Sequence, residues 1–137
     1  MNPLGVVFLD ENGFTAVFEL EDVAEKTVDP VTEYLIRCRE QFKDLSWFRN
    51  GPAPVTGDVC AITLLSRVYN GPDEYELFNG ARQRLADVLV RRFGAQDYDE
   101  VAGTGRDVFY VITTWNDQPH RTRQEVELAY DLAIAGW

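Results

Sequence analysis

The chain has 137 residues, of which 45% are apolar and 12% aromatic, and its formal net charge at pH 7 is −10. This length and composition predict a single folded domain over residues 1–137 and argue against disorder. The negative charge argues against nonspecific binding to nucleic acid, which depends on Lys and Arg at the phosphates, and against docking on anionic lipid.

No apolar run approaches the roughly 20 residues that a membrane span requires, and residues 1–5 lack the basic region of a signal peptide. Cys38 and Cys60 lie in apolar helical contexts, which is typical of buried thiols in a reducing compartment. We therefore expect a cytoplasmic protein. Two cysteines and one histidine are too few for a zinc site, and we expect neither a metal nor a cofactor.

Two β-prone runs, residues 6–9 and 14–18, flank Asn12-Gly13 near the start of the chain. Asn-Gly is the strongest short hairpin signal, because a type I′ turn needs positive φ at both central residues. The sequence thus predicts a β-hairpin over residues 1–20. A lone hairpin is not stable in water, so it should pack on helices, with self-association through its edge as an alternative.

Helices are predicted from residue 29 onward. Asp29-Pro30 supplies an N-cap and a first-turn proline for a helix whose apolar stripe reaches Leu45. A second helix over residues 59–69, capped by Asp58, is apolar on most sides and should be the most buried. A third runs from about residue 73 to residue 93, with Asn79-Gly80 as a potential break.

The last two predicted helices flank one polar corner. Asp107 should cap a helix over residues 108–114, although the valines and threonines of this segment suit a strand equally well. The final helix has the clearest start, because Thr122 and Glu125 form a capping box. The expected fold is therefore α+β, mostly α: an N-terminal β-hairpin (1–20) packed on a core of four to five helices (29–137).

The corner between these helices, residues 113–122, concentrates residue types that bind ligands. Our first interpretation is structural, with Trp115 as an apolar anchor and Asp117 paired with Arg121. The alternative is a contact surface that also draws on the loop over residues 47–55. The candidate binding residues are Trp115, Asn116, Asp117, His120, Arg121, Trp47 and Phe48.

The segment Trp115-Asn116-Asp117-x-Pro-x-Arg-Thr, followed by a helix with Asp131-Leu132-Ala133-Ile134, resembles the C-terminal signature of an uncharacterised family of small actinobacterial and actinobacteriophage proteins. That family has a Cys-Leu-Leu-Gly-Ala-Leu-like run upstream. Here Cys60-Ala61-Ile62-Thr63-Leu64-Leu65 stands at the comparable place, with Thr63 where the family has glycine. The resemblance covers residues 113–135 well and 30–137 loosely. It implies a helical fold and transfers no catalytic residue.

No catalytic set stands out. Ser46 and Ser66 lie in or next to predicted helices, without the strand-to-helix elbow that would place a nucleophile beside His120. Residues 103–106 lack the fuller pattern of a phosphate-binding loop. We favour a non-enzymatic protein that acts by protein–protein interaction, with a phage-encoded, host-directed protein as one version, and its charge favours a basic partner.

Two other functions remain open on the sequence. One is a small-molecule or nucleotide-binding protein, or an enzyme of unknown reaction, with a groove near Trp47, Phe48 and Trp115. The other is a virion or assembly component, which self-association at high concentration would reveal.

Overall fold

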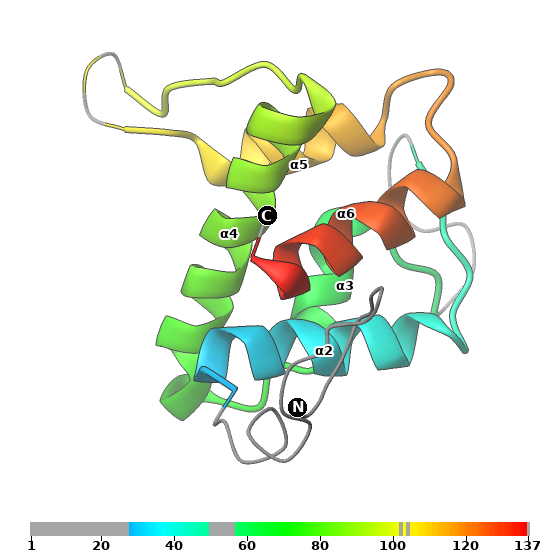
Figure 1. Cartoon of the computed structure of the whole chain (residues 1–137), viewed down its shortest axis with the longest axis vertical. Helices are drawn as coiled ribbons and strands as arrows, with labels where there is room; N and C mark the ends of the chain where they lie inside the picture. Colours follow the sequence, from blue (N-terminus) through cyan, green and yellow to red (C-terminus); the bar gives the residue numbers. More distant parts are fainter. Residues whose placement is uncertain (1–27, 50–56, 102, 104, 137) are drawn as a thin grey trace, which may run out of the picture.

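The computed structural model describes residues 28–49, 57–101, 103 and 105–136. These residues form five α-helices and one short 3-10 helix. In the order of the chain and with the labels of Figure 1, they are α2 (Pro30–Phe42), α3 (Ala61–Arg67), η1 (Pro72–Glu74), α4 (Tyr75–Phe93), α5 (Val108–Asn116) and α6 (Arg123–Ala135).

The helices surround α3. Helices α2 and α6 pack side by side, α4 packs against both, and α5 packs on α3 and α4 at the other end of the molecule from α2 (Figure 1). The faces turned inward are apolar and form one core cluster, to which α2 contributes Tyr34 and Leu35, α4 contributes Leu85 and Leu89, and α6 contributes Tyr130.

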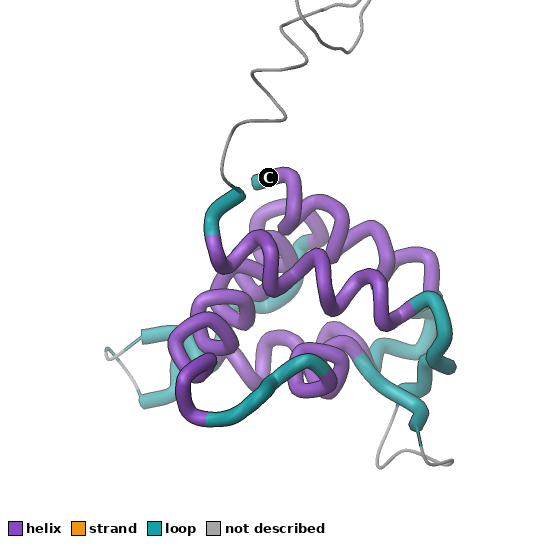
Figure 2. Tube along the Cα trace, turned by 90° about the horizontal axis from the view of Figure 1, so that it is seen from below, coloured by secondary structure: helices purple, strands orange, loops and turns teal. Residues whose placement is uncertain are grey.

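The expected α+β class is wrong for the residues that the structure describes. They contain no strand, only helices and loops (Figure 2), with two isolated bridges, Trp47 to Val59 and Asp99 to Arg106. The predicted hairpin lies in residues 1–20, outside the described part. Its signals were purely local, and no sheet among the described residues offers it an edge, because helix faces build the whole core.

Three of the predicted helix starts, those capped by Asp29, Asp107 and Thr122, are confirmed. Asp29 and Asp107 each accept a hydrogen bond from the backbone N–H three residues later, both at 2.9 Å. Thr122 and Glu125 form the expected capping box, at 3.2 and 3.0 Å. Residues 108–114 are helical, which resolves the helix-or-strand alternative.

Helix α3 begins later than expected and has a different cap. It starts at Ala61, with Cys60 rather than Asp58 at the N-cap position. The Thr63 hydroxyl accepts a hydrogen bond of 2.7 Å from the Cys60 N–H, which satisfies a donor that the helix itself leaves unpaired. Thr63 therefore stabilises the start of the central helix.

The sequence marks Asn79-Gly80 as a potential break, but α4 runs through it without interruption. Gly80 instead allows a close approach of α2. A Cβ atom at this position would lie 2.9 Å from Cγ2 of Val31. Real Cβ atoms essentially never come so close to another heavy atom. The glycine thus lets α2 and α4 pack closely at this point.

Cys38 and Cys60 are buried and free of disulfide bonds, as predicted. Burial raises the pKa of the Cys38 thiol from 9.0 to about 12. No described helix combines the length and apolar character needed to cross a membrane.

Candidate functional site

The corner between α5 and α6 is built around Trp115, whose side chain is only 3% exposed. Its ring meets Phe93 edge-on, with centroids 5.3 Å apart, and the Arg121 guanidinium lies 3.9 Å from the ring centroid on the other side. Arg121 also donates to the Trp115 carbonyl at 2.9 Å and pairs with Glu125 at 3.2 Å. These contacts hold the chain as it turns from one helix to the next.

Asn116 joins three segments of the chain. Its side chain is fully buried and its carbonyl oxygen accepts from the Trp47 indole at 2.7 Å and from the Ala61 N–H at 2.9 Å. Its amide nitrogen donates to the Phe48 carbonyl at 3.2 Å and to the Asp117 carboxylate at 3.0 Å. All four hydrogen-bonding positions of this amide are therefore in use.

The structure thus gathers most of the predicted binding residues, but largely around internal contacts. Trp47, Phe48 and Asp117 are half-buried around Asn116, while His120 is exposed. The sequence suggested that Asp117 pairs with Arg121. In the structure Glu125 pairs with Arg121, and Asp117 accepts from Asn116.

Helix α5 turns a second face away from the core. Its buried residues are Val111, Ile112, Trp115 and Asn116. The intervening positions make up what we call the outer face of α5: Phe109, Tyr110, Thr113, Thr114 and Asp117. The threonine hydroxyls donate to carbonyls of the preceding turn, those of residues 109 and 110 among them, so they add little free hydrogen-bonding capacity.

Two neighbouring aromatic side chains dominate this outer face. Phe109 is 55% exposed and Tyr110 is 48% exposed. The Tyr110 ring also meets Tyr98 edge-on, with centroids 4.6 Å apart. The sequence reasoning missed both residues. The signal was present, because burial of positions 111, 112 and 115 in a helix forces positions 109, 110 and 113 outward.

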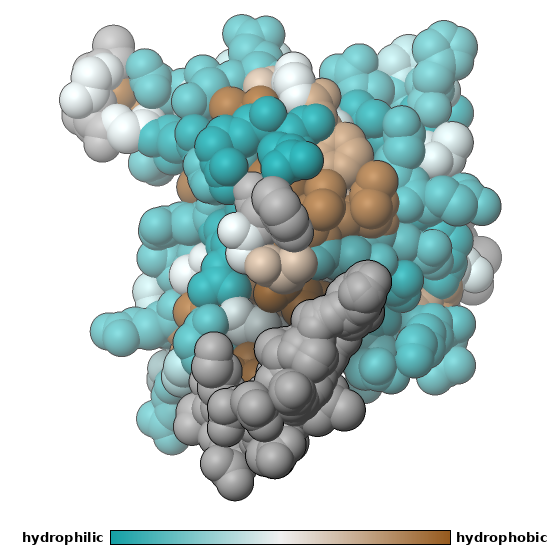
Figure 3. All heavy atoms as spheres, viewed as in Figure 1, coloured by the Kyte–Doolittle hydropathy of each residue, from teal (hydrophilic) through white to brown (hydrophobic). Residues whose placement is uncertain are grey.

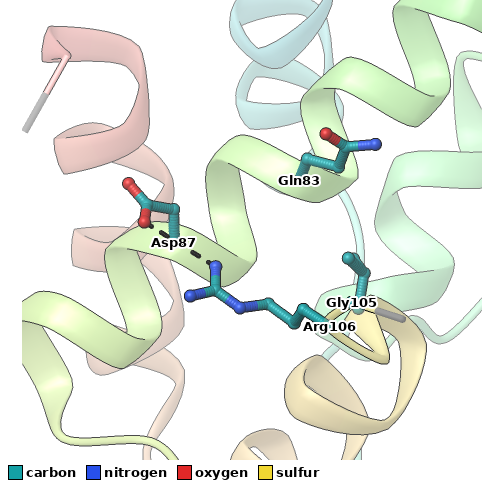
Figure 4. Close-up of a pocket in the computed structure, with 5 residues that line it drawn as sticks. Gln83, Asp87, Gly105 and Arg106 are labelled. Carbon is teal, nitrogen blue, oxygen red and sulfur yellow. Dashed lines mark ion pairs between the residues drawn. The ribbon is translucent and has the colours of Figure 1, made fainter. Parts of the chain in front are cut away.

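Three hollows lie near α5. The largest, about 470 Å³, lies between α4 and the start of α5, where the Arg106 side chain reaches from its loop toward Asp87 (Figure 4). The Arg106 guanidinium is 3.7 Å from the Asp87 carboxylate and 2.6 Å from Asp97. The hydrogen bond from Arg106 lowers the pKa of Asp97. This arginine thus ties the loop to α4.

A smaller hollow, about 220 Å³, adjoins it on the side of Phe109 and shares some of its lining. We call it the Phe109 hollow. Its lining residues are Asn79, Arg82, Gln83, Glu100, Arg106, Asp107, Val108 and Phe109. A third hollow, about 320 Å³, is lined by both Tyr98 and Thr114 on another side of α5. Residues of the outer face of α5 thus line two hollows, Phe109 one and Thr114 the other.

The titratable groups of the described residues form no arrangement that points to a reaction. No group of three or more His, Cys, Asp or Glu in this part of the chain could hold a metal ion. Cys38 is buried with a raised pKa, which leaves little of the thiolate that acts as a nucleophile.

Comparison with known proteins adds a family and no activity. No curated protein and no solved structure matches the chain. A family model described as a family of unknown function, DUF6197, matches residues 22–136, which include all the described helices. This agrees with the expectation of an uncharacterised family. The chain belongs to the DUF6197 family.

Proposed function

We propose that this protein acts by binding another protein, and that the outer face of α5 is the contact surface. The observation that supports this proposal is the pair of adjacent exposed aromatic rings, Phe109 and Tyr110. Aromatic side chains are enriched at the centres of protein interfaces, where a few of them supply most of the binding energy. Two such rings on one short helix provide an anchor of this kind.

The surroundings of α5 favour this face over other surfaces. Its inner side packs on α3 and α4, so the outer face is free to meet a partner. The rival is α6, over which apolar atoms gather in Figure 3. That helix presents one strongly exposed large apolar residue, Leu128 at 48%, and single exposed apolar residues are common on protein surfaces.

The source and the compartment belong to the same proposal. The resemblance at residues 113–135 supports an actinobacterial or actinobacteriophage origin, and we favour a phage-encoded protein that acts on a host protein. Two buried thiols support a reducing cytoplasm. A small-molecule site receives less support, because Arg106 reaches across the largest hollow beside α5 (Figure 4).

Site-specific photo-crosslinking tests the contact surface. A photoreactive phenylalanine analogue at position 109 should give a discrete protein adduct in actinobacterial cells, whereas the analogue at position 128 should not. The captured protein is then purified and titrated. Phe109→Ala should weaken its binding by roughly thirtyfold, the effect of losing an anchor worth about 2 kcal/mol.

The matched control is Leu128→Ala, which removes an equally exposed apolar side chain from α6 and should leave the affinity unchanged. Both variants should melt close to the wild type, because exposed side chains contribute little to stability. An affinity that falls with Leu128→Ala and not with Phe109→Ala would place the contact on α6 and refute the proposal. Concentration-dependent self-association lost in Phe109→Ala would favour an assembly component instead.

A further inference from the structure

We propose that the partner inserts a basic side chain, Arg or Lys, into the Phe109 hollow and lays a neighbouring apolar residue on Phe109 and Tyr110. This inference rests on the proposed contact surface and adds the chemistry of the segment that binds there. It follows from the size of the hollow, the charges around it and the ring at its edge.

The size of the hollow suits a side chain. At about 220 Å³ it falls below the roughly 300 to 1,000 Å³ typical of small-molecule sites. Phe109 lines it and is more than half exposed. A side chain that enters the hollow therefore leaves its neighbours in position to cover the two aromatic rings.

The charges around the hollow favour a cation. Of the two arginines in the lining, Arg106 is neutralised by Asp97, which it contacts through two hydrogen bonds of 2.6 and 3.1 Å. The other, Arg82, lines the hollow together with two carboxylates, Glu100 and Asp107. Without the Arg106–Asp97 pair, the hollow thus holds two negative groups against one positive group.

Glu100 is the carboxylate available to a partner. It is exposed, and none of the ion pairs among the described residues uses it. Asp107 already accepts from the Tyr110 N–H as the cap of α5. One terminal nitrogen of Arg82 donates to Asn79 at 2.7 Å, the guanidinium lies 4.9 Å from the Phe78 ring centroid, and its Nε is buried away from a ligand in the hollow.

The ring of Phe109 adds a second attraction for a cation. A guanidinium or ammonium within about 6 Å of an aromatic centroid is attracted by the electrons of the ring face. The same reasoning disfavours a second copy of this chain as the occupant. A second copy would bring a face with the same exposed Glu100 carboxylate rather than a basic group, and like charges across an interface oppose association.

The probe is a short peptide, acetyl-Gly-Arg-Leu-Leu-Arg-Gly-amide, titrated into the full chain and followed by the backbone amide signals in NMR spectra. The control is the same peptide with citrulline in place of both arginines, which keeps the shape of the side chains and removes their charge. The arginine peptide should shift the signals of Glu100, Phe109 and Tyr110 and should bind at least about fivefold more tightly than the citrulline peptide.

Charge reversal localises the effect. Glu100→Lys should weaken the arginine peptide by about fivefold to tenfold, because it removes an attraction and adds a repulsion. Glu33→Lys changes the net charge equally, from an exposed position of α2 outside the lining of the hollow. At physiological salt it should change the affinity by less than about twofold, since screening weakens the effect of charges that do not contact the peptide.

The outcomes separate this inference from the proposed function. Three results would overturn the inference that the partner inserts a basic side chain. They are equal binding of the two peptides, equal effects of Glu100→Lys and Glu33→Lys, and no binding of either peptide. In those cases, weaker binding of the cellular partner to Phe109→Ala would still support the outer face of α5 as the contact surface. If instead the arginine peptide binds Phe109→Ala as tightly as the wild type, Phe109 takes no part in binding the peptide and the inference is overturned.

Discussion

Replacing Asn116 by alanine tests whether this buried amide connects three segments of the fold. The change removes the acceptor for the Trp47 indole and for the Ala61 N–H, and the donor to the Phe48 carbonyl. Those three groups lose their partner at once. The variant should therefore be destabilised far more than the loss of one surface amide would predict.

The magnitude follows from the burial of each orphaned group. The hydrogen bond to Ala61 is buried, and an unsatisfied buried donor costs about 1 to 3 kcal/mol. The bonds to Trp47 and Phe48 are partly buried, so water replaces much of what is lost, and each contributes about 0.5 kcal/mol. The total is roughly 2 to 4 kcal/mol, or about 6 to 16 °C in Tm for a chain of this length.

The assay is thermal unfolding of a double-mutant cycle with Trp47→Phe, which removes the indole N–H and part of a ring packed against the core. Trp47→Phe should cost about 0.5 to 1 kcal/mol more in the wild-type background than in the Asn116→Ala background, because the packing loss is common to both. Gln118→Ala is the matched control, because it truncates an exposed amide of the same corner and should stay within about 0.5 kcal/mol of wild type.

Two results would refute this reasoning. One is an Asn116→Ala variant that melts within about 2 °C of the wild type, since unpaired buried groups must lower stability by more. The other is full additivity with Trp47→Phe, which would mean that the two side chains do not act through their mutual hydrogen bond.

Three further predictions concern packing, charge and the thiols. Gly80→Ala should lower stability by about 1 to 2 kcal/mol in urea unfolding, and Val31→Ala should cost less in that background than alone, because it removes the 2.9 Å clash. Hydrogen bonds from the Thr32 side chain and backbone lower the pKa of Asp29 from 3.8 to about 2, so its stabilisation is present above about pH 4 and lost as the pH falls toward 2. Asp29→Asn keeps an N-cap residue but removes the titrating group. Between pH 4 and pH 2 this variant should lose about 1 kcal/mol less stability than the wild type, a modest difference because the Asp29 side chain is 56% exposed. Thiol labelling of Cys38 and Cys60 should be slow in native buffer and fast in denaturant, and prompt labelling of the native chain would contradict the burial.

Local sequence signals predicted the helix starts well. At Asp29, Asp107 and Thr122 the side chain that caps the helix and the amide it accepts from are three residues apart. Such a signal is complete within one turn, so no knowledge of the fold is needed to interpret it.

Signals that depend on distant residues were missed or misjudged. The role of Asn116 is invisible in a local pattern, because the Trp47 indole and the Ala61 N–H that donate to its side chain lie 69 and 55 residues away. The sequence predicts Asp58 as the cap of α3, because an acidic residue before a helix is a familiar cap signal. A threonine inside the first turn that accepts a hydrogen bond from the N-cap N–H is a less familiar signal. The α+β class rested on residues 1–20 alone, and the described part of the chain contains no strand.

The central position of α3 has a consequence for how the chain folds. This helix has seven residues, whereas isolated helices shorter than about 12 to 15 residues are marginal in water. Two tyrosines hold it in place: Tyr34 of α2 donates to the Leu65 carbonyl at 2.6 Å, and Tyr130 of α6 donates to the Ala61 carbonyl at 2.7 Å. Since these donors lie 31 and 69 residues away, α3 gains both hydrogen bonds only when α2 and α6 pack on it. A chain still being synthesised, with α6 inside the ribosome, would therefore hold this short helix without the Tyr130 hydrogen bond.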